Sequence, residues 1–187
     1  MKLYRAIRTN LISQGFGPKY TKKSLLPFYN SIGLRAHNGT DFVLKRGEKI
    51  YWDCDVRGTV WKMSTDPKAG IGVSIITDDK DGRMKHIFWH LLENGIKCKL
   101  GQVLETGDLI GLGDSTGMST GDHLHRGLKR VDENNKTLNH GNGYWGAIDM
   151  SPYFTNIFVK DYMSTLKKKV ALLQSIIAVV KKLLKLL

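Results

Sequence analysis

The sequence predicts a mainly β protein, an antiparallel β-sheet with loops that wall a groove, followed by a C-terminal amphipathic helix. Its 187 residues include 20 glycines, with recurrent turn signals and short runs of Val and Ile, a composition typical of β structure. No long apolar period of 3.6 residues occurs before residue 160. Residues 164–187 then lack Gly and Pro, and Leu, Ile and Val recur at helical spacing. We therefore expect one domain over residues 1–157 and a cationic helix over residues 158–187.

Three apolar runs are the clearest strands of the predicted sheet. They are Val73–Thr77, Ile87–Trp89 and Leu109–Leu112, each short and rich in β-branched or aromatic residues. The stretch from Thr77 to Gly82 has the composition of a hairpin turn. Adjacent antiparallel strands are expected from this spacing.

The C-terminal segment has apolar residues at alternating steps of four and three, the heptad pattern of a coiled-coil seam. The seam consists of Leu166, Val170, Leu173, Ile177, Val180, Leu184 and Leu187. A second row widens it into a broad apolar face, namely Leu172, Ile176, Val179 and Leu183.

Three interpretations of this helix remain open. It could pack on the domain or self-associate as a coiled coil, or it could lie on an anionic membrane surface. A transmembrane span is disfavoured, because six lysines interrupt the apolar run. Residues 156–163 are expected to connect the domain to the helix.

The most informative motif is a Gly- and Ser-rich turn, residues 115–122, that leads directly into His123-Leu124-His125. Side chains two apart on a strand share a face, so both imidazoles would point into one site. Such a pair can bind a transition metal, or one imidazole can bind it while the other moves protons. Two surface histidines are the alternative.

A second motif, His37-Asn38-Gly39-Thr40-Asp41, again combines a histidine with a carboxylate. Histidine nitrogen and carboxylate oxygen without cysteine suit zinc in a catalytic site, which keeps one position open for water. Gly39 would allow the backbone to bend so that the two side chains converge. Asp41 alone could equally be an N-cap or a turn residue.

The other histidines and the cysteines carry weaker signals. His90 lies in an apolar run that predicts a buried strand, His86 has the pattern of a strand-edge surface residue, and His140 lies in a loop with no evident partner. The cysteines are Cys54 and Cys98, and both the paired and the free state are open.

Together these motifs resemble the lysostaphin/LytM-type zinc endopeptidases of bacterial cell walls. The resemblance is carried by His-x-x-x-Asp, by a later strand His followed by Leu, and by Ser-Thr-Gly-x-Ser-Thr-Gly-x-His-Leu-His in that order. Further similarity lies in the segments Ile12–Gly17, Arg57–Val60 and Gly101–Asp108. The similar region covers about residues 10 to 155. This sequence differs from the family pattern at two positions, Asp122 and Arg126.

The resemblance implies roles for five residues. His37, Asp41 and His125 would bind Zn²⁺, and His90 and His123 would be catalytic histidines that do not bind the metal. Which of the two is the base and which assists the oxyanion or the leaving amine is left open.

Two further possibilities concern residues near the site. Tyr29 is the nearest upstream candidate for a site tyrosine of the kind that the family often has. The segment from Pro18 to Ala36 is expected to form either a lid or substrate wall, or an ordinary surface loop.

The formal charge of +12 suits nucleic acid, an anionic membrane or an anionic wall polymer. No nucleic-acid motif accompanies the charge, so nucleic acid is not expected as a partner. Residues 1–8 lack the apolar core of a signal peptide. From this we expect a protein made in the cytoplasm that acts on the wall after release, as a phage endolysin does.

The resemblance thus implies a zinc metallopeptidase that hydrolyses peptide bonds in bacterial peptidoglycan. Two alternatives are a non-catalytic module that binds the wall or activates another hydrolase, and a protein that permeabilises membranes through its C-terminal helix. The scissile bond, the host and the oligomeric state are open at this stage.

Overall fold

The computed structural model describes residues 1–184, apart from the side chain of Leu183, and its main sheet is antiparallel, as expected. Seven strands lie in the order β2-β3-β11-β7-β6-β5-β9, each antiparallel to its neighbours. Their bounds are β2 Ile12–Gln14, β3 Thr40–Val43, β5 Gly58–Asp66, β6 Gly70–Asp79, β7 Gly82–Trp89, β9 Val103–Leu104 and β11 His123–Arg130. The three predicted strands lie within β6, β7 and β10, and the predicted hairpin joins β6 to β7.

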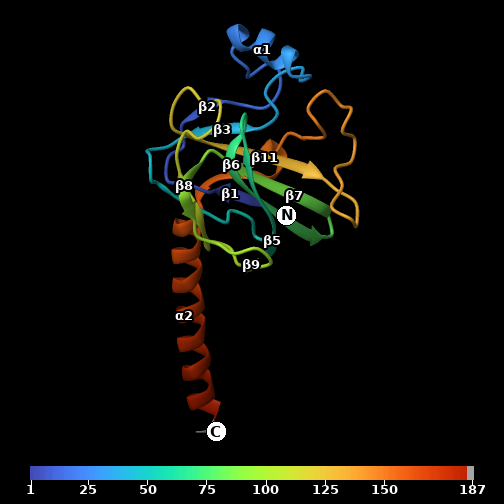
Figure 1. Cartoon of the computed structure of the whole chain (residues 1–187). Helices are drawn as coiled ribbons and strands as arrows, with labels where there is room; N and C mark the ends of the chain where they lie inside the picture. The colour runs from blue at the N-terminus through green and yellow to red at the C-terminus, as the bar shows by residue number, and fades with distance from the viewer. Residues whose placement is uncertain (185–187) are drawn as a thin grey trace.

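Smaller elements complete the domain (Figure 1). A three-stranded antiparallel sheet has the order β4-β10-β8, and β1 pairs in parallel with β12. The short helix α1 spans Leu26–Ser31, between β2 and β3. The remaining bounds are β1 Leu3–Arg5, β4 Lys49–Tyr51, β8 Leu91–Ile96, β10 Leu109–Gly113 and β12 Phe154–Phe158. Two 3₁₀ turns cover Lys23–Leu25 and Ser151–Tyr153.

One face of strand β11 packs in the core, and the other face carries two of the site histidines. Leu124, Arg126 and Leu128 are buried on one face, and the alternate positions His123 and His125 point to the other. The apolar core receives side chains from the seven-stranded and the three-stranded sheet, among them Phe42, Ile50, Ile75, Phe88, Ile110 and Leu124.

A fully buried ion pair lies on the core face of β11. The guanidinium of Arg126 donates two hydrogen bonds to Asp53, of 3.0 and 2.9 Å, and lies 4.2 Å from the ring centre of Phe88. Its Nη2 also lies 2.8 Å from His86 Nδ1, and His86 Nε2 lies 2.9 Å from the Thr77 hydroxyl.

The prediction of His86 as a surface residue was therefore wrong. His86 is wholly buried in β7, and burial together with the Arg126 charge lowers its pKa well below the ordinary value. The polar residues around it in sequence suggested an edge strand, but β7 lies between β6 and β11 in the sheet.

The C-terminal helix α2, Val159–Leu184, begins directly at the end of β12, so the connecting segment expected at 156–163 is strand and helix instead. Its first turn contacts the domain: Val159 is buried, and the rings of Tyr162 and Tyr4 stack with centroids 4.3 Å apart. Residues 164–182 are all exposed and project away from the domain (Figure 1).

Packing of this segment on the domain, one of the sequence interpretations, is therefore not observed. Lys185, Leu186 and Leu187, which the sequence prediction included in the helix, lie outside the described residues. Among residues 1–184, no helix combines the length and the apolar character needed to cross a bilayer.

We expect Arg126→Met to lower the free energy of unfolding by about 3–5 kcal/mol, because it leaves the Asp53 carboxylate buried without its partner. Adding Asp53→Leu removes that carboxylate and should restore part of the loss. The matched control is Arg57→Met, since the Arg57–Glu105 pair is largely exposed and such pairs contribute about 0–1 kcal/mol. Chemical denaturation measures all three, and equal effects of the two arginine substitutions would contradict the expectation.

Candidate metal centre and groove

The pairing of β11 with β3 brings together the two sequence motifs that carried the metal prediction. In this antiparallel register His125 lies opposite Asp41, and His37 lies in the loop just before β3. His125 Nδ1 is 2.9 Å from Asp41 Oδ1, and His37 Nε2 is 3.1 Å from Asp41 Oδ1 and 3.0 Å from His125 Nδ1. His37 and Asp41 are buried, and His125 is half-buried. The convergence expected from sequence is thus observed.

The orientation of His37 is set by backbone partners. Its Nδ1 donates to the carbonyl oxygen of Gly15, 3.0 Å away, in the turn that follows β2. Its backbone N–H donates to the hydroxyl of Thr21 at 3.0 Å. A hydrogen at Nδ1 leaves Nε2 as the lone-pair atom, and Nε2 is the atom that faces Asp41 and His125.

The three converging atoms fit a zinc ion. Ligand atoms of a tetrahedral site, each about 2.0–2.1 Å from the metal, lie roughly 3.3 Å apart, and the three separations here are 2.9–3.1 Å. Burial alone would raise the pKa of Asp41, but the neighbouring imidazoles of His125 and His37 outweigh it and hold this pKa well below its usual range. The donor set is therefore two imidazoles and an ionised carboxylate, which suits Zn²⁺.

His90 and His123 lie beside these three residues, with ring centroids 4.4 Å apart. His90 Nδ1 donates to the Thr116 carbonyl oxygen at 2.7 Å, and His123 Nδ1 donates to that of Gly121 at 2.8 Å. Each ring therefore keeps Nε2 as an acceptor. The Nε2 of His123 is 3.7 Å from Asp41 Oδ2, and burial lowers the pKa of His90 to about 4.

His90 does not lie within a strand, contrary to the sequence prediction. It occupies the junction between β7 and β8 with a φ of 63°, a backbone conformation that is uncommon for residues other than glycine. The apolar residues before it suggested that the strand continued. The turn instead directs the imidazole toward His123.

The five residues lie in a cavity of about 1260 Å³. The segment from Pro18 to Ala36 supplies one wall, through side chains that include Phe28, Tyr29 and Ile32. Of the two sequence alternatives for this segment, a wall of the groove is the one observed. The ring of Tyr29 is centred 5.9 Å from that of His37, and its hydroxyl accepts a hydrogen bond from Gln14.

Sequence reasoning missed three other residues of the groove, Trp89, Trp145 and Lys129. A Cβ at Gly72 would lie 2.1 Å from the ring of Trp89, so this glycine accommodates the tryptophan. Lys129 follows His123 and His125 on the same face of β11, and burial together with Lys85 lowers its pKa to about 8. Because side chains alternate along a strand, counting on by twos from His125 would have placed Lys129 on the same face.

Gly39 is required for space more than for bending. A Cβ at this position would lie 2.5 Å from His125 Cε1 and 2.8 Å from the carbonyl oxygen of Arg126. Real Cβ atoms do not approach this closely, so any side chain here displaces His125 or the backbone of β11. The sequence correctly indicated that Gly39 matters, but the reason is the close approach of His125 and not a bend of the backbone.

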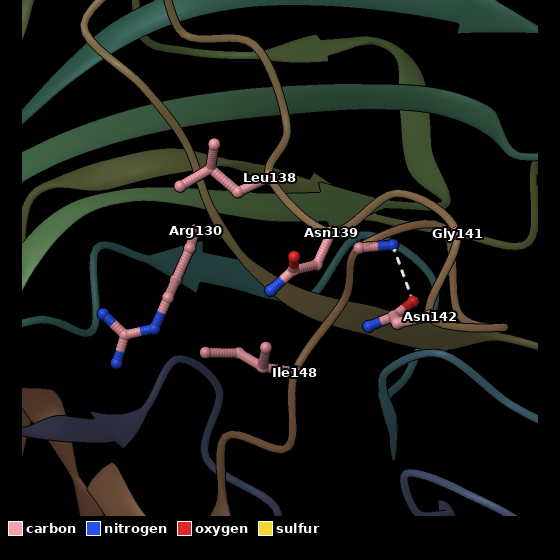
Figure 2. Close-up of a pocket in the computed structure, with 7 residues that line it drawn as sticks. Arg130, Leu138, Asn139, Gly141, Asn142 and Ile148 are labelled. Carbon is pink, nitrogen blue, oxygen red and sulfur yellow. Dashed lines mark hydrogen bonds between the residues drawn. The ribbon is translucent and has the colours of Figure 1, made fainter.

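A second cavity of about 390 Å³ lies beyond the far end of β11 and contains none of the five residues. Figure 2 shows Arg130, Leu138, Asn139 and Ile148 around it. The guanidinium of Arg130 donates to the Asp81 carbonyl and to the Tyr153 hydroxyl, and the Asn142 side chain accepts from the N–H of Gly146. These groups are engaged within the domain, and the exposed His140 nearby joins no histidine cluster.

The two cysteines, left open by the sequence, are both free and buried, and burial raises the pKa of Cys54 to about 12. Neither belongs to the His37, Asp41 and His125 group. The donor set and the two neighbouring histidines have the composition of a catalytic zinc site.

The sequence profile of Peptidase family M23 matches residues 35–144, and the chain belongs to this family. A peptidoglycan DD-endopeptidase, ShyA of Vibrio cholerae, is 37% identical over 114 residues, which are 61% of this chain and 24% of that protein. An uncharacterised metalloprotease of Haemophilus influenzae is 33% identical over 93 residues, 49% of this chain and 18% of that protein. The chain thus matches about a quarter or less of the length of these relatives.

Solved structures have the same fold. The catalytic domain of lysostaphin from Staphylococcus simulans aligns with a TM-score of 0.57 at 23% identity, covering 76% of this chain and 90% of that domain. A zinc-containing peptidase from Vibrio cholerae aligns with a TM-score of 0.55 at 27% identity, covering 74% of this chain and 39% of the other. The mainly β fold expected from the sequence is therefore confirmed.

We expect Gly39→Ala to weaken zinc binding by about 10–100-fold, the range seen when residues that hold a metal ligand in place are altered. The cause is displacement of His125 by the new Cβ. Competition with a chromophoric chelator measures the affinity. Gly141→Ala is the control, because its Cβ meets open space, and equal zinc affinities for both variants would contradict the packing argument.

Proposed function

We propose that this chain is a zinc-dependent endopeptidase that hydrolyses peptide bonds in bacterial peptidoglycan. The observation that carries the proposal is the meeting of His37, Asp41 and His125 with two further histidines that keep free Nε2 atoms. Membership of family M23 and the similarity to a peptidoglycan DD-endopeptidase support the substrate class. In this proposal the walls of the groove determine which peptide bond of the peptidoglycan is cut.

In this proposal His37, Asp41 and His125 hold the metal. Bound zinc supplies Lewis-acid polarisation of the scissile carbonyl and a water whose pKa is lowered to about 7. The Nε2 atoms of His90 and His123 carry out the proton transfers. One accepts the proton of the attacking water, and the other, in its protonated form with a hydrogen on Nε2, donates to the oxyanion or to the leaving amine. The carbonyls of Thr116 and Gly121 accept hydrogen bonds from the Nδ1 atoms of His90 and His123, which leaves both Nε2 atoms for this proton exchange.

The alternative of a non-catalytic wall-binding or activating module is less well supported. Such a module has no need of two orientated acceptor nitrogens beside a metal centre. Here His90 and His123 each have a backbone carbonyl that fixes the Nδ1 hydrogen, and their rings lie 4.4 Å apart. The arrangement suits turnover.

We expect His125→Ala to abolish zinc retention, whereas His123→Ala retains zinc and loses turnover by about 10²–10⁴-fold, the usual contribution of a general acid or base. Elemental analysis measures the zinc, and mass spectrometry of muropeptides released from defined walls measures turnover and identifies the cut bond.

His140→Ala is the matched control, since His140 lies in an exposed loop and should keep both zinc and activity. A zinc-free His123→Ala protein, or an active His125→Ala protein, would overturn this division of roles. Intact zinc binding with no muropeptide release by the unaltered protein would favour the non-catalytic module.

We further propose that the enzyme is made in the cytoplasm and reaches the wall when the membrane is breached, as a phage endolysin does. Leu3 and Ile7 are buried in the core, and β1 pairs with β12. These residues thus serve the fold of the domain.

Induction of the chain in the cytoplasm of a bacterium with a peptidoglycan wall should leave culture turbidity unchanged until chloroform permeabilises the membrane. Rapid clearing should then follow, and His123→Ala should not clear. Clearing before chloroform is added would contradict the proposed route. If that clearing survived His123→Ala and required residues 164–184, it would instead support killing by the helix.

A further inference from the structure

The exposed part of α2 has no role in the proposed peptidase site. The helix is attached through its first turn, where Val159 is buried, Tyr162 stacks on Tyr4, and Lys160 Nζ lies 5.1 Å from the ring centre of Tyr51. From residue 164 to 182 every residue is exposed. The helix leaves the domain at the end opposite α1, which walls the groove (Figure 1). Contacts made by this segment therefore leave the groove accessible.

The apolar side chains of this segment cover about half of the helix circumference when placed at helical spacing. Their exposed fractions lie between 38% and 66%, and the residues are Leu166, Val170, Leu172, Leu173, Ile176, Ile177, Val179, Val180 and Leu184. A two-stranded coiled coil uses a narrower stripe of a and d positions. An apolar face this wide is better covered by the apolar region of a lipid layer than by a single partner helix.

The charges of the helix favour an anionic partner. Asp161, in the first turn, is the sole carboxylate of the described helix, against six lysines, of which Lys167, Lys168, Lys181 and Lys182 lie on or border the polar face. In a self-associated bundle these lysines would meet those of the other copies with no glutamate or aspartate to pair with. Anionic lipid headgroups supply the missing charge. An anionic wall polymer would supply charge but would leave the apolar half in water.

The apolar stretch is too short to cross a bilayer. Residues 170–180, between Lys169 and Lys181, span about 17 Å at 1.5 Å per residue, against a hydrocarbon thickness of about 30 Å. A helix with one apolar half and lysines at its ends instead lies in the plane of the interface, with its basic side chains directed to the headgroups.

We propose that residues 164–184 of α2 are an interfacial helix that binds the surface of an anionic phospholipid bilayer. The apolar half enters the boundary between headgroups and acyl chains, and the lysines contact lipid phosphates. The inference is independent of the proposed peptidase function, because it concerns a different surface of the molecule.

Vesicle flotation with the full chain tests the proposal. We expect binding to vesicles of phosphatidylglycerol and phosphatidylethanolamine to be at least about tenfold tighter than to phosphatidylcholine vesicles, and to weaken with salt. The triple variant Leu173→Gln, Ile176→Gln, Val180→Gln keeps every charge but interrupts the apolar half, and should lose at least about tenfold in vesicle affinity.

The matched control places the same three glutamines on the polar face, as Ala171→Gln, Ser175→Gln, Ala178→Gln. This control should bind vesicles within about twofold of the unaltered chain. Thermal unfolding of each variant verifies that the domain is intact.

Three results would overturn the proposal. The first is equal binding to anionic and zwitterionic vesicles. The second is a stable oligomer in solution that the apolar-face variant converts to a monomer, with no flotation of the unaltered chain, since self-association would then cover this face. The third is helix-dependent binding to lipid-free walls without flotation, which would identify a wall polymer as the partner.

Discussion

The pairing of β11 with β3 is the constraint on which the site depends. Antiparallel register places His125 opposite Asp41 and His123 opposite Val43, so one strand contributes a metal-binding imidazole and a neighbouring imidazole to the same face. A slip of one residue would turn both histidines toward the core and expose Leu124 and Arg126. The register is held from both sides, because β11 also pairs with β7 over six residue pairs.

The two faces of β11 hold charge in different ways. On the groove face, Asp41 is stabilised as a carboxylate by His125 and His37. On the core face, Arg126 is fully buried but is satisfied by Asp53, the Gly127 carbonyl and His86. Burying a charge is tolerated only where it is paired and hydrogen-bonded. The Arg126 pair therefore ties β11 to the segment after β4, behind the strand that carries the site.

Much of this arrangement follows from the sequence, since strand periodicity predicted the sheet and the spacing in His-x-His predicted one shared face. The family resemblance that the ordered motifs carry implied which five residues meet, although their roles at the site stay predictions. The environment of His86 could not be predicted, because a polar residue among Arg and Lys gives no sign that Asp53 and Arg126 lie beside it in the core. The turn at His90 was missed for a related reason: the residue combines a positive φ with a hydrogen bond to the Thr116 carbonyl, and that partner is distant in sequence. The period of α2 predicted a helix, but periodicity alone does not tell which partner covers an apolar face.

X-ray absorption spectroscopy at the zinc edge, on protein loaded with one equivalent of zinc, identifies the atoms that bind the metal. We expect nitrogen and oxygen atoms only around the zinc, at about 2.0–2.1 Å, with the multiple-scattering signature of two imidazoles. A sulfur scatterer at about 2.3 Å, which would mean that Cys54 or Cys98 binds the metal, would contradict it. So would the absence of protein-bound zinc after dialysis.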